Sequence, residues 1–142
     1  MKISTILATK GANVITIHPE QSVREVIALF VQHNIGALVV VDAAGAVVGI
    51  ISERDVVRAL PQVADLLTQP VSAIMTRTVI VASPQDDVVS VMRTMTEKRF
   101  RHLPILDGGK LAGLISIGDI IKAQLDESQG EVETLETQII EG

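Results

Sequence analysis

The chain places its apolar residues in two rhythms, one typical of helices and one typical of buried strands. Val23, Val26, Ile27 and Phe30 recur at the spacing of one helix face, which predicts an amphipathic helix. The run Ala37–Val41 is continuously apolar and rich in β-branched residues, as expected for a strand covered on both sides. The other expected elements are an opening strand at 14–17, a turn at 42–45, a return strand at 47–51 and a helix from 52 to about 60.

The second half of the chain repeats this order of strand, helix, strand, strand and helix. Val88, Val91, Met92 and Met95 form the apolar face of a helix that begins at Asp87. The elements expected after it are a strand at 103–106, a turn at 107–109, a strand at 111–116 and a helix that reaches about residue 125. The spacing therefore predicts an α/β protein with a β-α-β-β-α pattern in each half.

Three pairs of segments show that one unit is written twice. Residues 3–8 resemble 71–76, residues 14–19 match 79–84, and residues 48–55 match 112–119. Pro61 and Pro70 bracket an expected linker. We therefore divide the chain into a first repeat at 3–60, a linker at 61–70, a second repeat at 71–125 and a C-terminal tail at 126–142.

The C-terminal tail differs from the repeats in composition. It holds six acidic residues and no basic one. Val132, Leu135 and Ile139 have the spacing of an apolar stripe on a helix. Two interpretations stay open: a solvated acidic tail, or a terminal helix that packs on a partner subunit.

Three helix starts carry hydroxyl and carboxyl groups at capping spacing. Ser22 and Glu25 fit a capping box. Both repeats contain the motif Gly-h-h-Ser-x-x-Asp, in which h is apolar: it ends at Asp55 in the first repeat and at Asp119 in the second. Ser52 and Ser116 favour a helix N-terminus as caps. A helix start can also hold an anion, and a neighbouring carboxylate can accept both hydroxyls of a ribose, so capping and ligand binding are compatible.

A basic cluster at 98–102 stands out in an acidic chain. Lys98 and Arg99 suit the C-terminal end of a helix. Arg101 and His102 follow at the entry to a buried strand, and with Arg54 they could converge on a phosphate. His102 would add positive charge as the pH falls toward about 6.5. Since Gly36 and Ala37 take the places of Arg101 and His102 in the first repeat, the phosphate site would be asymmetric.

Composition excludes several classes of function. The net charge of −5 and only two aromatic residues argue against nucleic-acid binding. The chain has no cysteine, and its longest apolar runs are too short to span a membrane. The N-terminus lacks the apolar run of a signal peptide, so we expect a cytoplasmic protein.

No motif points to catalysis. The sequence has no phosphate-binding Gly-x-x-x-x-Gly-Lys-Ser/Thr run, and its three histidines show no metal-ligand spacing. No local pair of nucleophile and base is present either. We therefore expect a protein that is not an enzyme and that requires no cofactor.

The repeat and its motifs resemble the CBS (cystathionine β-synthase) domain family. Arg101–Ile105 carries part of this resemblance, and residues 34–41, Ile51–Asp55 and Ser116–Asp119 are typical of bacterial proteins that consist of a CBS pair. The resemblance to such a pair, a Bateman module, covers residues 3–125. It implies two repeats related by a pseudo-twofold axis, with a ligand cleft on each side.

The resemblance also implies which residues form the clefts. The first cleft would take Ser52, Arg54, Asp55, Val79, Arg101, His102 and Pro104. The second would take Val14, Ile15, Gly36, Ala37, Ser116 and Asp119. In the second, Gly118 stands where the first has Arg54, so this cleft departs from the phosphate-binding pattern of the first.

The function implied is that of a regulatory module that binds AMP, ADP, ATP or an NAD(H)-type molecule. The alternative is a structural dimerisation module without a nucleotide ligand. Either way we expect a homodimer, because the aliphatic residues exceed what a small pair can bury. A regulated enzyme is a further expected partner.

Overall fold

The computed structural model describes residues 1–11 and 13–128 of the chain. Its helices and strands follow in the order α1 (Ile3–Lys10), β1 (Thr16–Ile17), α2 (Val23–His33), β2 (Ala37–Val41), β3 (Val47–Ser52), α3 (Glu53–Ala59), η1 (Leu66–Thr68), η2 (Val71–Ala73), α4 (Val88–Lys98), β4 (His102–Asp107) and β5 (Lys110–Ser116). A last helix begins at residue 117 and continues to the end of the described region at 128. None of the helices in this region is long and apolar enough to cross a membrane.

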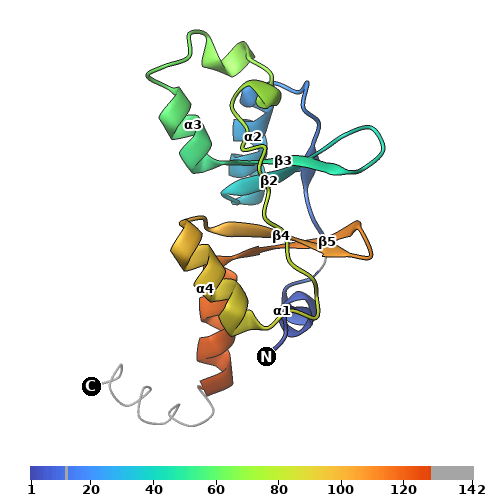
Figure 1. Ribbon diagram of the computed structural model, residues 1–142. Coiled ribbons are helices and arrows are strands. Elements are labelled where there is room, and N and C mark those ends of the chain that lie inside the picture. The colour runs from blue at the N-terminus through green and yellow to red at the C-terminus, as the bar shows by residue number, and fades with distance from the viewer. Residues whose placement is uncertain (12, 129–142) are drawn as a thin grey trace, which may run out of the picture.

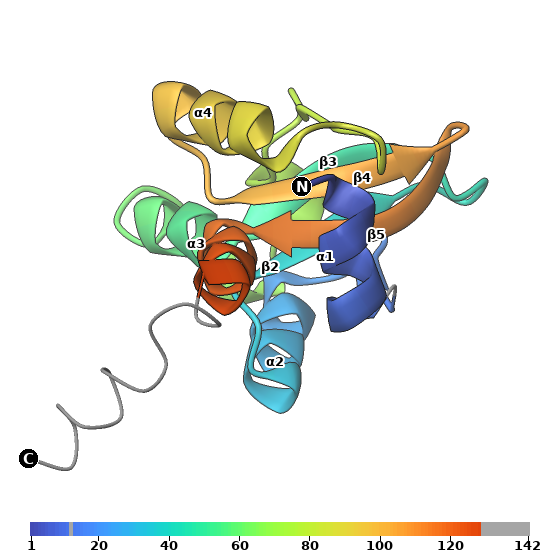
Figure 2. The ribbon, with the colours of Figure 1, turned by 90° about the horizontal axis from the view of Figure 1, so that it is seen from below.

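Two lobes lie one above the other, and the sheets face each other where the lobes meet (Figure 1). The helices cover the outer sides of the sheets, as the view from below also shows (Figure 2). In the first lobe β2 is the central strand, parallel to β1 and antiparallel to β3. All of Ala37–Val41 is buried, which confirms the prediction of a strand covered on both faces.

The second lobe has a smaller sheet than its sequence pattern predicts. It contains the antiparallel pair β4 and β5. The opening strand expected before α4 is reduced to one parallel bridge between Ala82 and Ile105. The backbone turns directly after that bridge, because the N–H of Ser83 donates to the carboxylate of Asp86. The expected strand is therefore too short to count as one.

The helix starts follow the predicted caps with one exception. The Ser52 side chain and the Asp55 carboxylate form a full capping box at α3. At α2, the Ser22 hydroxyl accepts from the N–H of Glu25, but the reciprocal bond is not made. The carboxylate of Glu25 accepts instead from the side-chain amide of Gln21 at 2.7 Å. The capping box predicted at Ser22 is thus half formed.

Each lobe is completed by a segment from the other part of the chain. Helix α1 lies within the residues assigned to the first repeat, yet Ile3 and Ile6 belong to the core of the second lobe with residues of α4, β4 and β5, so the boundary drawn from the sequence at residue 3 is not the boundary of the lobe. Conversely, Leu66, Val71 and Met75 lie in the core of the first lobe with residues of α2, β2 and β3. Residues 61–70, expected as a linker, thus include a buried leucine on η1. The two cores therefore each join segments from both halves of the sequence.

Equivalent hydrogen bonds mark the pseudo-twofold relation between the repeats. At the helix after β3, the N–H of Glu53 donates to the carbonyl of Gly36. Its counterpart after β5 is the bond from Ile117 to the carbonyl of Arg101, and both measure 3.0 Å. The repeated pattern brings the starts of α3 and of the last helix to corresponding places. Of the acidic tail, residues 129–142 lie outside the described region, and so does the proposed apolar stripe.

Candidate functional site

The residues predicted for the first cleft line two adjoining cavities. One has a volume of about 280 Å³, and the other about 230 Å³. The first is lined by Ser52, Arg54, Asp55, Arg101 and His102. Val79, His102 and Pro104 line the second. Both cavities share Ile50, Thr76, Phe100 and His102, so the structure brings the seven predicted residues into one continuous region.

Asp55 lies at the start of α3, and part of the hydrogen-bonding capacity of its carboxylate is used to cap that helix. Its Oδ2 atom accepts from the N–H of Ser52 at 2.9 Å and from the Ser52 hydroxyl at 3.1 Å. Its Oδ1 atom accepts from the hydroxyl of Thr76 at 3.2 Å. A carboxylate has about four acceptor positions, so a ligand hydroxyl can still be accepted here. Because the capping box uses the first donors of this helix, the carboxylate is the better candidate for a ligand contact than the helix N-terminus.

The second cleft is a further cavity of about 380 Å³, which shares Gly36 and His102 with the lining of the first cleft. It is lined by all the residues predicted for it: Val14, Ile15, Gly36, Ala37, Ser116 and Asp119. Its wall also contains Lys10, which the sequence prediction did not include, and the amide side chains of Asn13 and Asn34. The end of α1, with Lys10, and the start of the last helix, with Ser116 and Asp119, therefore both supply polar groups to this cavity.

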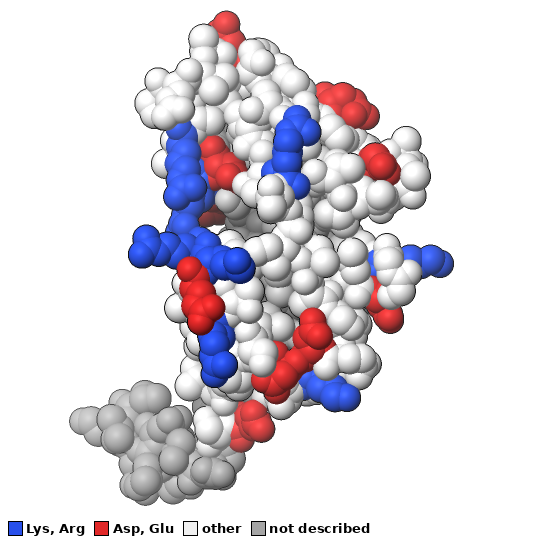
Figure 3. All heavy atoms as spheres, viewed as in Figure 1, with Lys and Arg blue, Asp and Glu red and all other residues white. Residues whose placement is uncertain are grey.

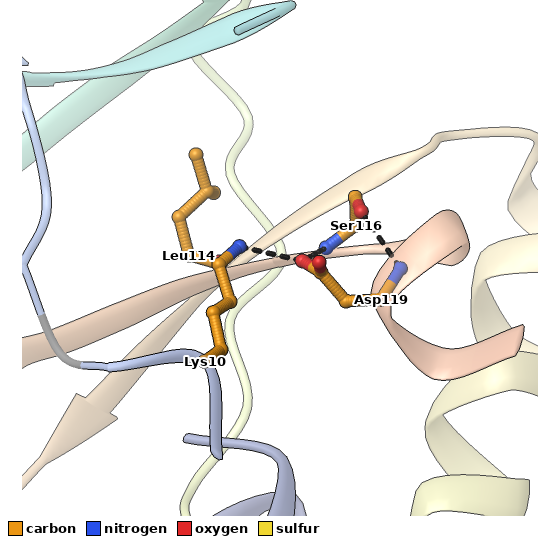
Figure 4. Close-up of polar contacts among 4 residues, drawn as sticks. All are labelled: Lys10, Leu114, Ser116 and Asp119. Atoms are coloured by element: carbon orange, nitrogen blue, oxygen red, sulfur yellow. Dashed lines mark hydrogen bonds and ion pairs between the residues drawn. The ribbon is translucent and has the colours of Figure 1, made fainter. Parts of the chain in front are cut away.

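Lys10 holds the aspartate of the second cleft (Figure 4). Its ammonium lies 2.5 Å from Oδ2 of Asp119 and donates to the carbonyl of Leu114 at 2.6 Å. The same carboxylate oxygen accepts from the N–H of Ser116 at 2.9 Å. Burial would raise the pKa of Asp119, but the bonds from Lys10 and Ser116 outweigh it and hold that pKa below its ordinary value. Asp119 is therefore an ionised group with a cationic partner.

The two clefts differ in the number of cations that line them. Arg54, Arg58, Arg99 and Arg101 all line the first cleft. Among the described residues, Lys10 is the only lysine or arginine that lines the second. Figure 3 shows lysine and arginine side chains gathered along the edge formed by α3 and the end of α4, beside acidic ones. The predicted asymmetry of charge is present, although the second cleft has a cation that the repeat comparison did not reveal.

His102 lies between the two clefts, since it lines the cavities of both. Desolvation by burial lowers its pKa below the ordinary value of 6.5, and the charges of Lys10 and Arg101 lower it further. Asp119 and Glu53 act in the opposite direction but do not outweigh burial. The expectation that His102 gains charge as the pH approaches 6.5 is therefore wrong for the protein in this state, because the ring stays neutral to lower pH.

Sequence reasoning missed Lys10 and Thr76, the two groups that contact the cleft aspartates. Both belong to the segments exchanged between the lobes: Lys10 is the last residue of α1, and Thr76 follows η2. Segments 3–8 and 71–76 correspond in the repeat, but Ala8 stands where Thr76 does, so no shared polar pattern marks these positions. Only the fold places them beside carboxylates that lie far away in the sequence.

Two α/β repeats, with clefts lined by residues of both, define a paired-repeat module. The family described as "CBS domain" matches residues 4–62 and 71–126. The CBS-domain protein ATU1752 from Agrobacterium tumefaciens is 42% identical, with a TM-score of 0.84 over 87% of this chain and 99% of its own. The chain therefore belongs to the CBS domain family, and the resemblance drawn from the sequence is confirmed.

Two further relatives differ in how much of their own length this chain spans. An uncharacterized 33.4 kDa protein of Thermofilum pendens is 42% identical over 105 residues, which are 74% of this chain but only 34% of that protein. The CBS domain pair of protein MJ0100 is 29% identical, with a TM-score of 0.79 over 89% of this chain and 98% of its own. That pair was solved in complex with 5′-methylthioadenosine and S-adenosyl-L-methionine.

Proposed function

We propose that this protein is a regulatory module that binds an adenine nucleotide, with AMP as the leading candidate. The observation that carries the proposal is the first cleft, where the Asp55 carboxylate and Arg54 and Arg101 line one cavity. A carboxylate suits the two hydroxyls of a ribose, and planar guanidinium groups suit a phosphate. Apolar groups of Val79 and Pro104 in the adjoining cavity offer a surface for the base.

The relative with a ligand supports the adenosine part of this proposal. The two compounds bound to the MJ0100 pair both contain adenosine, and neither carries a phosphate. In this chain the arginines beside Asp55 favour a ligand with a negatively charged end. We therefore place AMP, ADP, ATP and NAD(H)-type molecules ahead of S-adenosyl-L-methionine, whose sulfonium is positively charged.

A regulatory role without catalysis is part of the proposal. The two carboxylates that face the clefts, Asp55 and Asp119, are engaged as helix caps, and their other contacts come from Thr76 and Lys10. These contacts position the groups for binding, and none of them forms a nucleophile–base pair. Ligand binding here would act by changing the contact between the lobes, and a partner enzyme could bind the two arrangements with different affinity.

Calorimetric titration of the purified protein tests the proposal. AMP, ADP, ATP, NADH, adenosine, 5′-methylthioadenosine and S-adenosyl-L-methionine would be titrated separately, with GMP as a control for the base. We expect saturable binding of at least one adenine nucleotide, and a thermal stabilisation of about 2.7 kcal/mol at 100 times its dissociation constant. Failure of every adenine compound to bind or stabilise the protein would refute it.

The structural dimerisation module is the alternative that this titration also tests. Exposed apolar side chains on the outer helices favour it, among them Val31 on α2 and Val57 on α3. A protein that dimerises tightly and binds none of the compounds would fit this alternative.

A further inference from the structure

Lys10 occupies a fixed place on the wall of the second cleft. Helix α1 is anchored in the second lobe by Ile3 and Ile6, which are fully or almost fully buried. Leu7 lies against Gly113 of β5 so closely that a side chain at that glycine would overlap it. Lys10 follows one turn later, at the end of the helix, with its side chain about one-third exposed. The helix backbone is thus held, and the long side chain reaches Asp119 and the carbonyl of Leu114 from its end.

The partners of the two cleft aspartates differ in charge. The Asp55 carboxylate accepts a hydrogen bond from the neutral hydroxyl of Thr76. The Asp119 carboxylate forms an ion pair with the ammonium of Lys10. A ribose that takes the place of the Thr76 hydroxyl exchanges one neutral hydrogen bond for another. A ribose that takes the place of Lys10 breaks an ion pair and leaves the ammonium with the neutral carbonyl of Leu114 and water, without an anionic partner.

The ligand itself can supply that partner if it carries a phosphate. Gly36, Ala37 and Lys10 line the same cavity of about 380 Å³ as Asp119. A cavity of that size accepts a small ligand, so an anionic group bound there would lie within the same enclosure as the lysine. The lost contact with Asp119 would then be replaced by a charge-assisted contact with the phosphate.

We propose that Lys10 is the anion-binding residue of the second cleft, and that it exchanges Asp119 for the phosphate of a nucleotide whose ribose binds Asp119. This rests on the proposed function and deepens it. It makes the second cleft selective for phosphorylated adenosine, although the position equivalent to Arg54 is Gly118. A nucleoside would separate Lys10 from Asp119 without supplying a second anionic partner for the lysine.

The test compares AMP with adenosine in variants of Lys10. Calorimetry would be done on the full chain carrying Asp55→Ala, which weakens the first cleft, and then on the same chain with Lys10→Met or Lys10→Arg. Asp119→Ala in the same background identifies the binding that belongs to the second cleft. Thermal unfolding of every variant shows whether loss of the ion pair has altered the fold.

We expect Lys10→Met to weaken AMP binding roughly 10–150-fold, the range for one hydrogen bond to a charged group. Adenosine should bind equally well or more tightly, because Asp119 is released, and Lys10→Arg should keep most of the AMP affinity. Equal loss for both ligands, or unchanged AMP binding in a folded Lys10→Met variant, would overturn the role of Lys10. If the unaltered protein binds no adenine compound at all, the proposed function fails and this inference fails with it.

Discussion

Asp55 is at once a helix cap and the proposed ribose acceptor of the first cleft. Replacing it with alanine should weaken AMP binding roughly 10–150-fold, because a hydrogen-bonded charged group is lost. The same change should cost about 1 kcal/mol of stability through the lost cap. Asp55→Asn is the matched control for stability, since an amide oxygen can still accept from the N–H of Ser52.

Calorimetry and thermal unfolding of both variants separate the two roles of Asp55. A folded Asp55→Ala protein with the affinity of the parent in the first cleft would show that this carboxylate does not contact the ligand.

Arg101 should distinguish phosphorylated from unphosphorylated ligands. It lines the first cleft beside Arg54, and charge-assisted bonds to phosphate are about twice as strong as neutral ones. Arg101→Ala is therefore expected to cost AMP more affinity than adenosine, and AMP binding should weaken as salt is added. Equal losses for the two ligands would mean that Arg101 shapes the pocket without contacting phosphate.

His102 should make the protein less stable as the pH falls. Burial lowers its pKa in the folded protein below the ordinary 6.5, so the unfolded chain binds more protons in the window beneath 6.5. The stability due to the neutral ring is complete above that value and is lost as the pH falls through the lower pKa of the folded protein. Urea unfolding across this window should show the decline, and His102→Gln should show less of it. An identical pH dependence in the variant would contradict the assignment.

At the level of elements, the contact of α1 with β5 depends on Gly113. A Cβ there would overlap the Cδ2 atom of Leu7, and because the end of that side chain can move, Gly113→Ala should lower stability by about 0.5–1.5 kcal/mol, the cost of a displaced rotamer. Leu7→Ala should relieve the overlap, and the double variant should lose less than the sum of the single changes. Urea unfolding of the three variants measures this. Additive losses would show that Leu7 and Gly113 do not interact.

The order of the elements was predictable because each has a strong local pattern. The run Ala37–Val41 has no polar position, and α2 and α4 carry apolar residues at helical spacing. The length of the strand expected near Ala82 was not predictable, because the same apolar run is compatible with a full strand or with the single bridge that is observed. Likewise the Ser22 box depended on Glu25, whose partner turned out to be the neighbouring Gln21.

The cleft residues were predictable only in part. Asp55 and Asp119 stand in a repeated motif, so the sequence singled them out together. Lys10 has no counterpart in that motif and reaches Asp119 across more than a hundred residues of chain. A contact of this kind depends on the exchange of segments between the lobes, which local patterns do not encode.

At the scale of the whole molecule, the helices on the outer sides present apolar residues to solvent. The exposed large aliphatic residues on α2, α3, α4 and the last helix, together with the C-cap of α3, are Val31, Val57, Leu60, Val89, Ile121 and Leu125. We expect a homodimer that covers part of this surface. Light scattering should give twice the chain mass of 15.2 kDa, and Val31→Glu should shift the equilibrium toward monomer. A monomer mass at all concentrations, with and without AMP, would contradict this.

The exchanged segments also govern how such a chain can be divided or can arise. If the polypeptide were cut between Pro61 and Pro70, one fragment would retain α1 without the core that holds it, and the other would retain η2 without its own partners. The fragments could complete both cores only by reassociating. An ancestor with a single repeat would have faced the same need and would have had to borrow its covering segment from a second copy. Duplication within one gene makes this exchange permanent, because the repeat that supplies the segment and the repeat that it covers then belong to one polypeptide.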